Sequence, residues 1–75
     1  MTNDPATIYV ELLDEGTSAW RPVHAVHIAG DVYRIVSENL HPGEERWRFP
    51  SGAVVRCEER QLSRGPFLVA SALAE

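Results

Sequence analysis

Two short strands joined by a tight turn form the clearest pattern in the sequence, at residues 26–35, VHIAGDVYRI. Gly30-Asp31 makes a two-residue loop with glycine first, as a type II′ hairpin turn prefers. The turn predicts four facing pairs: Ala29 with Val32, Ile28 with Tyr33, His27 with Arg34, and Val26 with Ile35. Facing residues share one side of a sheet, so the apolar pairs fall on one face and the polar pair on the other. The stretch therefore predicts a β-hairpin.

The same register conflicts with the residues that precede the hairpin. Extended backward, it turns His24 inward and the apolar Val23 and Ala25 outward. A β-bulge inserts one extra residue and reverses this alternation. We therefore expect a bulge or a sharp bend between Val23 and Val26.

A second hairpin is predicted around Pro50 and Gly52, the second and fourth positions of a type I turn followed by a glycine bulge. It pairs Phe49 with Ala53, Trp47 with Val55, and Arg46 with Arg56. The inward side chains are then Trp47, Phe49, Ala53, Val55 and Cys57. The outward ones are Arg46, Arg48, Val54, Arg56 and Glu58. On that outward face, Glu44 and Glu58 would relieve the repulsion between the two facing arginines.

Further strands are predicted at residues 8–13, 20–29 and 67–71, with polar connections at 14–19 and 37–45. Pro22 lies near the start of its strand, where a missing N–H donor is best tolerated. Residues 70–75 either complete the last strand or form a short C-terminal helix. The pattern indicates an all-β fold, a small SH3-like barrel of five or six short antiparallel strands whose last strand pairs with its first. The predicted single domain spans residues 6–71, with terminal tails at 1–5 and 72–75.

Length and composition restrict what this chain can be. It has 75 residues, 7 arginines and no lysine, 11 acidic residues, a net charge of −4 and one cysteine. Such a chain has room for one domain, which excludes a multi-domain enzyme. A lone Cys57 forms no internal disulfide and indicates a reducing compartment. Without a signal peptide or a membrane-spanning apolar run, we expect a cytoplasmic protein with no membrane partner, as a monomer or weak homodimer.

Four segments carry a resemblance to a group of short, uncharacterised bacterial proteins. They are ELLDEG at 11–16, WRPVHA at 20–25, YRI at 33–35, and WRFPSGAVVRC at 47–57. Together they are similar to that group's series E-L-L-D-E-G, W-R-P-V-x-A, Y-R-I and W-x-F-P-x-G-x-V-V-R-C. The resemblance implies a cytoplasmic bacterial protein and carries no activity with it. The group often has an acidic residue where this chain has His24, which argues against an essential role for that histidine.

Neither catalysis nor metal binding is expected. His24 and His27 are three residues apart, and an odd separation on a strand sends them to opposite faces unless a bulge intervenes. Cys57 belongs to the inward set, where burial makes a thiol unreactive. The sequence contains no Gly-x-Ser-x-Gly, phosphate-loop or dinucleotide motif. A barrel of this size has a filled interior, without the pocket of about 300 Å³ that a substrate needs. We predict no catalytic residue, metal or cofactor.

The preferred function is a non-enzymatic module that binds a protein partner. Its candidate site combines Asp14 and Glu15 of the first polar loop with Trp20 and with Tyr9, which alternates outward from the first strand. An exposed aromatic ring beside carboxylates suits a cationic or arginine-rich peptide. The other interpretation of Trp20 is a plug at one end of the barrel, because a small core needs its large aromatic side chains.

The alternative function is a small nucleic-acid or ribonucleoprotein accessory. Its binding face would consist of the outward-facing Arg34, Arg46, Arg48 and Arg56. The net charge of −4 disfavours this alternative, because the chain as a whole repels phosphate.

Overall fold

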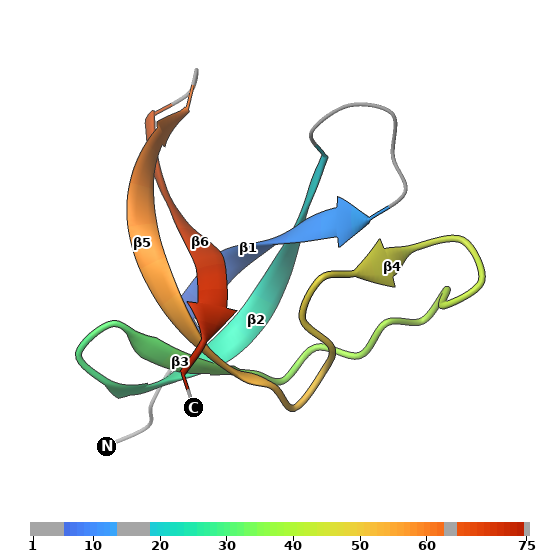
Figure 1. Ribbon diagram of the computed structural model, residues 1–75, viewed down its shortest axis with the longest axis horizontal. Coiled ribbons are helices and arrows are strands. Elements are labelled where there is room, and N and C mark those ends of the chain that lie inside the picture. Colours follow the sequence, from blue (N-terminus) through green and yellow to red (C-terminus); the bar gives the residue numbers. More distant parts are fainter. Residues whose placement is uncertain (1–5, 14–18, 63–64, 75) are drawn as a thin grey trace.

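Six β-strands make up the regular structure of the computed structural model, which describes residues 6–13, 19–62 and 65–74 (Figure 1). The strands are β1 (Ala6–Leu13), β2 (Trp20–Ala29), β3 (Val32–Ile35), β4 (Arg46–Trp47), β5 (Val54–Leu62) and β6 (Gly65–Leu73). The described residues form no helix. They therefore include no helix that could cross a membrane.

Five of the strands close into a ring in the order β2-β3-β5-β6-β1, and β1 pairs back with β2. The predicted small all-β barrel, with its last strand beside its first, is confirmed. The prediction of antiparallel pairing throughout fails at one seam, where β1 and β6 are parallel and Tyr9 lies opposite Val69. The reason is parity. Strand directions cannot alternate all the way around a ring with an odd number of members.

The hairpin between β2 and β3 has the predicted turn but a different register beyond it. Gly30 has a φ of 52°, and Ala29 lies opposite Val32 as expected. The register then shifts between His27 and Ala29, so that His27 faces Tyr33 instead of Arg34. The bulge therefore falls at the turn end of β2, and not between Val23 and Val26 as predicted.

The bulge at the turn changes the predicted face of Ile28, and it leaves Val23 inward and His24 outward, as the expected bulge would also have done. Val23 and Ala25 are buried, whereas His24 is exposed. Ile28, predicted to point inward, is 48% exposed. A single bulge at the turn resolves the conflict in the apolar pattern, because all residues before it change face together.

The predicted hairpin between residues 46–49 and 53–57 does not form. Trp47 pairs with Leu12 of β1, and β5 pairs with β3 and β6 instead. The Ala53 N–H donates to the Pro50 carbonyl at 3.1 Å, so the turn spans residues 50–53, one residue later than predicted. Gly52 is its third residue, and its φ of 87° is the value a type II turn requires. The chain leaves this turn along β3 and does not retrace its path, so the predicted pattern of Arg46 facing Arg56 and Glu44 facing Glu58 is wrong.

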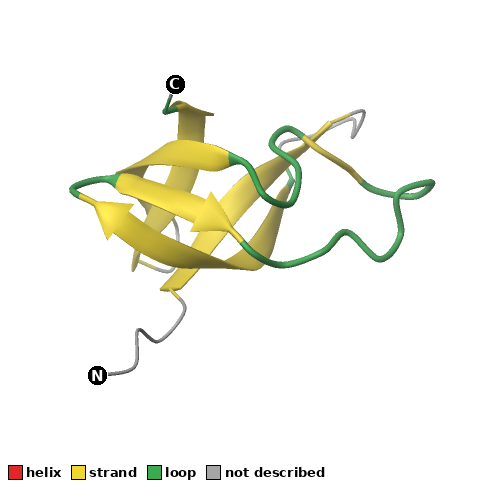
Figure 2. Ribbon diagram, turned by 90° about the horizontal axis from the view of Figure 1, so that it is seen from below, coloured by secondary structure: helices red, strands yellow, loops and turns green. Residues whose placement is uncertain are grey.

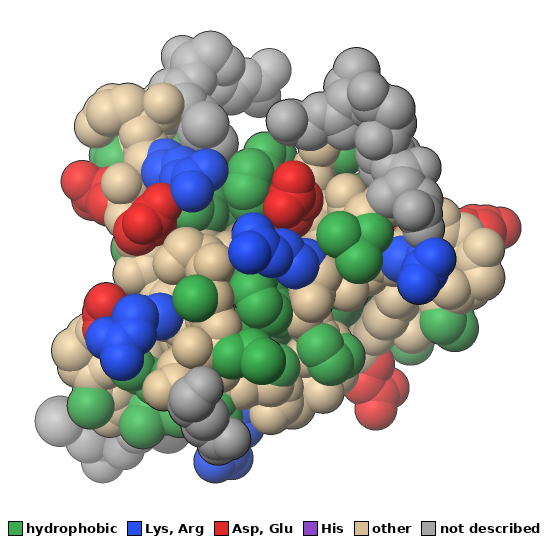
Figure 3. Space-filling view, in the orientation of Figure 1, with side chains coloured by type: hydrophobic (Ala, Val, Ile, Leu, Met, Phe, Trp, Pro, Cys, Tyr) green, Lys and Arg blue, Asp and Glu red, His purple; other side chains and the backbone are tan. Residues whose placement is uncertain are grey.

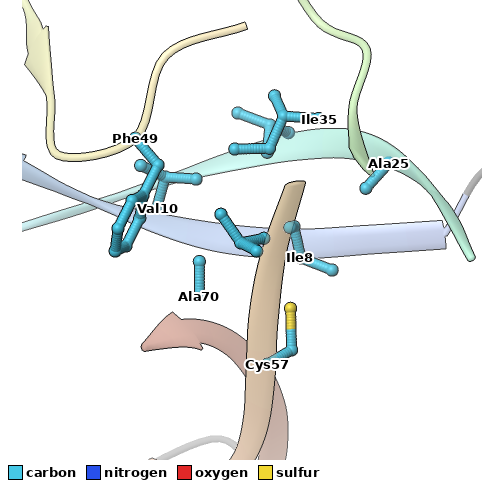
Figure 4. Close-up of a cluster of buried hydrophobic side chains, with 9 residues drawn as sticks. Ile8, Val10, Ala25, Ile35, Phe49, Cys57 and Ala70 are labelled. Carbon is cyan, nitrogen blue, oxygen red and sulfur yellow. The ribbon is translucent and has the colours of Figure 1, made fainter. Parts of the chain in front are cut away.

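The inward set predicted for this region is nevertheless correct. Phe49, Val55 and Cys57 lie in the core, and Trp47 and Ala53 pack against it. The rest of the core comes from the other strands of the ring: Ile8, Val10, Val23, Ala25, Ile35 and Ala70. Figure 4 shows these side chains converging between the strands, with the Cys57 sulfur directed toward β1.

The C-terminal residues continue the sheet. β6 runs to Leu73, so the helical alternative for residues 70–75 is wrong over its described part. Ala72 and Leu73, predicted to lie in a tail, belong to this strand, and the predicted N-terminal tail lies outside the described residues. Figure 2 shows the strands curving around a common interior, and the connection between β3 and β4 projecting away from them.

Candidate functional site

A surface groove lies between the first half of β2 and the connection that follows β3. We call it the β2 groove. Its lining residues are 21–24 of β2, 37–41 of the connection, Glu45 and Trp47. Its volume is about 420 Å³, within the range of small-ligand sites. The prediction that the molecule offers no hollow of this size is therefore wrong, because it considered the interior of the barrel and not its surface.

Glu45 is the centre of the polar contacts in the β2 groove. Its carboxylate accepts a hydrogen bond from Arg21 Nε at 3.0 Å and a second from an Arg21 terminal nitrogen. It also accepts one from Trp47 Nε1 at 3.2 Å. The side chain of Glu45 is 20% exposed. A two-point guanidinium–carboxylate contact fixes orientation as well as distance, so these three residues form a defined end of the groove.

The connection that walls the groove is held by its own side chains. Asn39 Nδ2 donates to the Glu45 carbonyl at 2.7 Å, and the His41 N–H donates to Asn39 Oδ1 at 3.0 Å. The N–H groups of Glu44 and Glu45 both donate to the His41 carbonyl. Asparagine commonly supports such turns, because its amide can replace backbone partners. Leu40, at the centre of this network, is 76% exposed on the wall of the groove.

The opposite wall is an edge of β2. The His24 N–H donates to Ser37 Oγ at 2.8 Å, and the His24 carbonyl accepts from the Val36 N–H at 2.9 Å. The backbone of His24 therefore points away from β1, and so does that of Pro22 two residues earlier. Proline has no N–H, so the row of backbone N–H donors along this wall is interrupted at Pro22. An added strand would find no continuous ladder of partners here.

The predicted aromatic and acidic site is only partly described. Asp14 and Glu15 lie outside the described residues. Tyr9 and Trp20 share the outer face of β1 and β2, in the diagonally adjacent pairs Tyr9–Pro22 and Glu11–Trp20. Trp20 is half-buried and lies outside the core cluster, so its interpretation as a barrel plug is wrong.

Each of these two aromatic rings already has a partner, on β6 for Tyr9 and on β5 for Trp20. Tyr9 meets Phe67 edge to face, with ring centroids 4.9 Å apart. The Arg60 guanidinium lies over the Trp20 ring, 6.0 Å from its centroid. Arg60 is also paired with Glu58 at 2.7 Å. These contacts connect β5 and β6 to β1 and β2 on the outer face.

The four arginines of the predicted nucleic-acid face are exposed but divided between two places. Arg34 and Arg56 lie diagonally on the outer face of the β3–β5 pair. Arg46 and Arg48 lie in and after β4, which pairs with β1. Acidic partners accompany two of them, since Arg48 contacts Glu11 at 3.5 Å and Arg56 lies 3.7 Å from Asp31. In Figure 3 the basic side chains are likewise dispersed, with acidic ones close to several of them.

The histidines and the cysteine do not assemble into a site. Within the described ranges, no three His, Cys, Asp or Glu side chains lie close enough to hold a metal ion. His27 Nε2 is 2.8 Å from the Gly30 carbonyl, and its ring packs on Tyr33. Burial, with a smaller contribution from Asp31, raises the pKa of the Cys57 thiol to about 11. This thiol is therefore protonated, and unreactive as a nucleophile, at neutral pH.

Sequence reasoning did not identify the β2 groove. Arg21 and Glu45 are 24 positions apart, and no local pattern connects them. Asn39 gave the one usable signal, because asparagine in a polar connection often organises a turn. The chain matches no protein-family model, no curated protein and no solved structure. The function proposed below therefore rests on the geometry of the chain itself.

Proposed function

We propose that this protein is a non-enzymatic binding module that holds a segment of a partner protein in the β2 groove. The observation that carries the proposal is Leu40, a leucine 76% exposed on a connection that hydrogen bonds hold in place. Covering apolar surface that is already fixed in position is favourable and costs little ordering entropy. The groove beside Leu40 offers room for the partner's side chains.

Glu45 and Ser37 of the groove are engaged in contacts that support binding better than catalysis. The carboxylate of Glu45 is occupied by Arg21 and Trp47, and the hydroxyl of Ser37 accepts from the His24 backbone. A catalytic base needs a free lone pair within reach of a substrate proton, and a nucleophile needs a base beside it. Contacts of this kind fix the shape of a site instead.

The cytoplasm of a bacterial cell is the proposed setting. The free, buried thiol of Cys57 agrees with a reducing compartment. Nucleic acid is a weaker candidate than protein, because the exposed arginines lie in two separate places and two of them have acidic neighbours.

Site-directed photocrosslinking in the native cell tests the proposal. A benzophenone amino acid replaces Leu40 in the full chain, and a matched one replaces Ile28, which is also exposed but lies outside the groove. We expect a discrete protein adduct from position 40 and none from position 28, with excess unlabelled protein reducing the yield. The absence of a position-40 adduct, or equal labelling at both positions, contradicts the proposal. A nuclease-sensitive adduct would favour the nucleic-acid alternative.

A further inference from the structure

Among the described residues, two of the three carboxylates to which the structure gives no ion pair belong to the connection beside the β2 groove. Four arginines are paired with acidic side chains in the contacts Arg21–Glu45, Arg48–Glu11, Arg56–Asp31 and Arg60–Glu58. Across residues 6–13, 19–62 and 65–74, the structure gives no ion pair to Glu38, Glu44 or Glu59. The first two belong to the connection that walls the groove, and Glu38 lines the groove itself. Negative charge is therefore left over at this wall.

The side chains that line the β2 groove also carry a net negative charge. Among the described lining residues, Arg21 is the only arginine or lysine, and Glu45 neutralises it. Glu38 remains as an exposed carboxylate near Leu40, two residues further along the connection. The half-buried Trp47 also lines the groove, and the bond from its Nε1 to Glu45 holds the indole in place. Carboxylates and aromatic faces both attract cations, and arginine and lysine are the side chains that satisfy both.

We propose that the partner segment presents an arginine or lysine beside an apolar side chain, the cation toward Glu38 and Trp47 and the apolar group over Leu40. This inference rests on the proposed function and names the chemistry of its partner. The wall formed by Pro22 excludes backbone pairing as the main mode of recognition, so side chains supply the specificity. The net charge of −4 favours the approach of the same class of partner.

Three short capped peptides test the inference by NMR titration of the full chain. The probes are arginine-leucine-arginine, glutamine-leucine-glutamine and glutamate-leucine-glutamate, each flanked by alanines. We expect the arginine peptide to bind most tightly, with saturable shifts at the Trp47 indole N–H and the amides of residues 37–41. Glu38→Gln should weaken its binding about threefold, as loss of one exposed ion pair does. Added salt should weaken it as well.

Glu59→Gln is the matched control, because it removes the same charge from an exposed carboxylate on β5, outside the groove. It should leave the dissociation constant within about 1.5-fold, since distant exposed charges are largely screened. The inference is overturned if the glutamate peptide binds as tightly as the arginine peptide. It is also overturned if the shifts map outside the groove, or if both variants weaken binding equally. A position-40 photoadduct combined with failed peptide binding would reject the cationic chemistry and leave the proposed function standing.

Discussion

Val69 lies directly opposite Tyr9 across the parallel seam of the barrel and is fully buried, although it does not belong to the main core cluster. Its neighbours Leu68 and Ala70 pack into or against that core, so Val69 points to the other face of the sheet. There the Tyr9 ring packs against Phe67. The seam is therefore stabilised from both faces.

Shortening Val69 tests how much the outer face of the sheet contributes to the stability of the seam. Val69→Ala should lower the free energy of unfolding by about 2 kcal/mol, because it leaves a cavity at a fully buried position. Val36→Ala, at a valine that is 44% exposed, should change it by less than about 0.5 kcal/mol. Urea melts of the two variants provide the comparison. Equal effects would mean that the outer face contributes nothing to closure of the barrel.

Neutralising Glu45 tests whether the groove depends on its central carboxylate. Glu45→Gln should cost about 1 kcal/mol, because it weakens charge-assisted contacts to Arg21 that are partly exposed. It should also speed hydrogen exchange at the amide of His41. Glu44→Gln is the control, since it removes the same charge one position away and the described residues give its side chain no ion pair. If Glu44→Gln loosens the connection as much, Glu45 has no special structural role.

The position of the bulge in β2 makes opposite predictions for two apolar residues. Ile28→Thr should leave stability within about 0.5 kcal/mol, because Ile28 is 48% exposed. Ala25→Leu should cost about 1–3 kcal/mol through overpacking, because Ala25 is completely buried. Thermal melts distinguish this arrangement from the unbulged hairpin, for which the larger loss would come from Ile28→Thr.

Stability should fall at alkaline pH because of Cys57. Its pKa is raised to about 11 in the folded protein, while the unfolded chain releases the proton near the ordinary value. The stability that the protonated Cys57 thiol contributes is therefore fully present below the ordinary thiol pKa. It is lost as pH rises toward 11. Between about pH 8 and pH 10 the loss should amount to roughly 1 kcal/mol.

Urea melts across this pH range measure the effect, and Cys57→Ala is the control. That variant should have lower stability at neutral pH but a flatter dependence on alkaline pH. Because the chain contains no lysine, few other side chains change charge in the same range. An unchanged slope in Cys57→Ala would assign the alkaline loss to other groups.

For residues 47–57 the sequence could predict which side chains point inward, but not which strands lie beside them. Alternation is a property of each strand, and it correctly placed Phe49, Val55 and Cys57 in the core. Pairing depends on where the chain turns. A turn one residue later than predicted carried the segment after Pro50 to β3 and left Trp47 beside β1. The bulge in β2 was also predicted at the wrong position, because the local sequence does not determine where the extra residue falls.

The candidate site was less accessible to sequence reasoning than the fold. In the β2 groove Arg21 and Trp47 both contact Glu45, and Arg21 does so from 24 positions away, which no local sequence pattern predicts. The predicted cationic partner was inferred from an aromatic ring beside Asp14 and Glu15, which lie outside the described residues, so at that site it stays a prediction. Strand periodicity was sufficient to predict the outward position of Tyr9, but it left the position of Trp20 open, and the structure places Trp20 on the same outer face.

The parallel seam also has a kinetic consequence. The β5–β6 hairpin connects residues that are close in sequence, whereas Tyr9 and Val69 are about sixty positions apart. Pairing over such a distance requires the chain to lose loop entropy before any contact compensates for it, and barrels of this kind fold in milliseconds to seconds. On the ribosome, β1 is made first among the six strands but can be secured on its β6 side only after β6 has emerged. Until then its edge is open to other chains, and this is the interval in which the nascent protein is most exposed to misassembly.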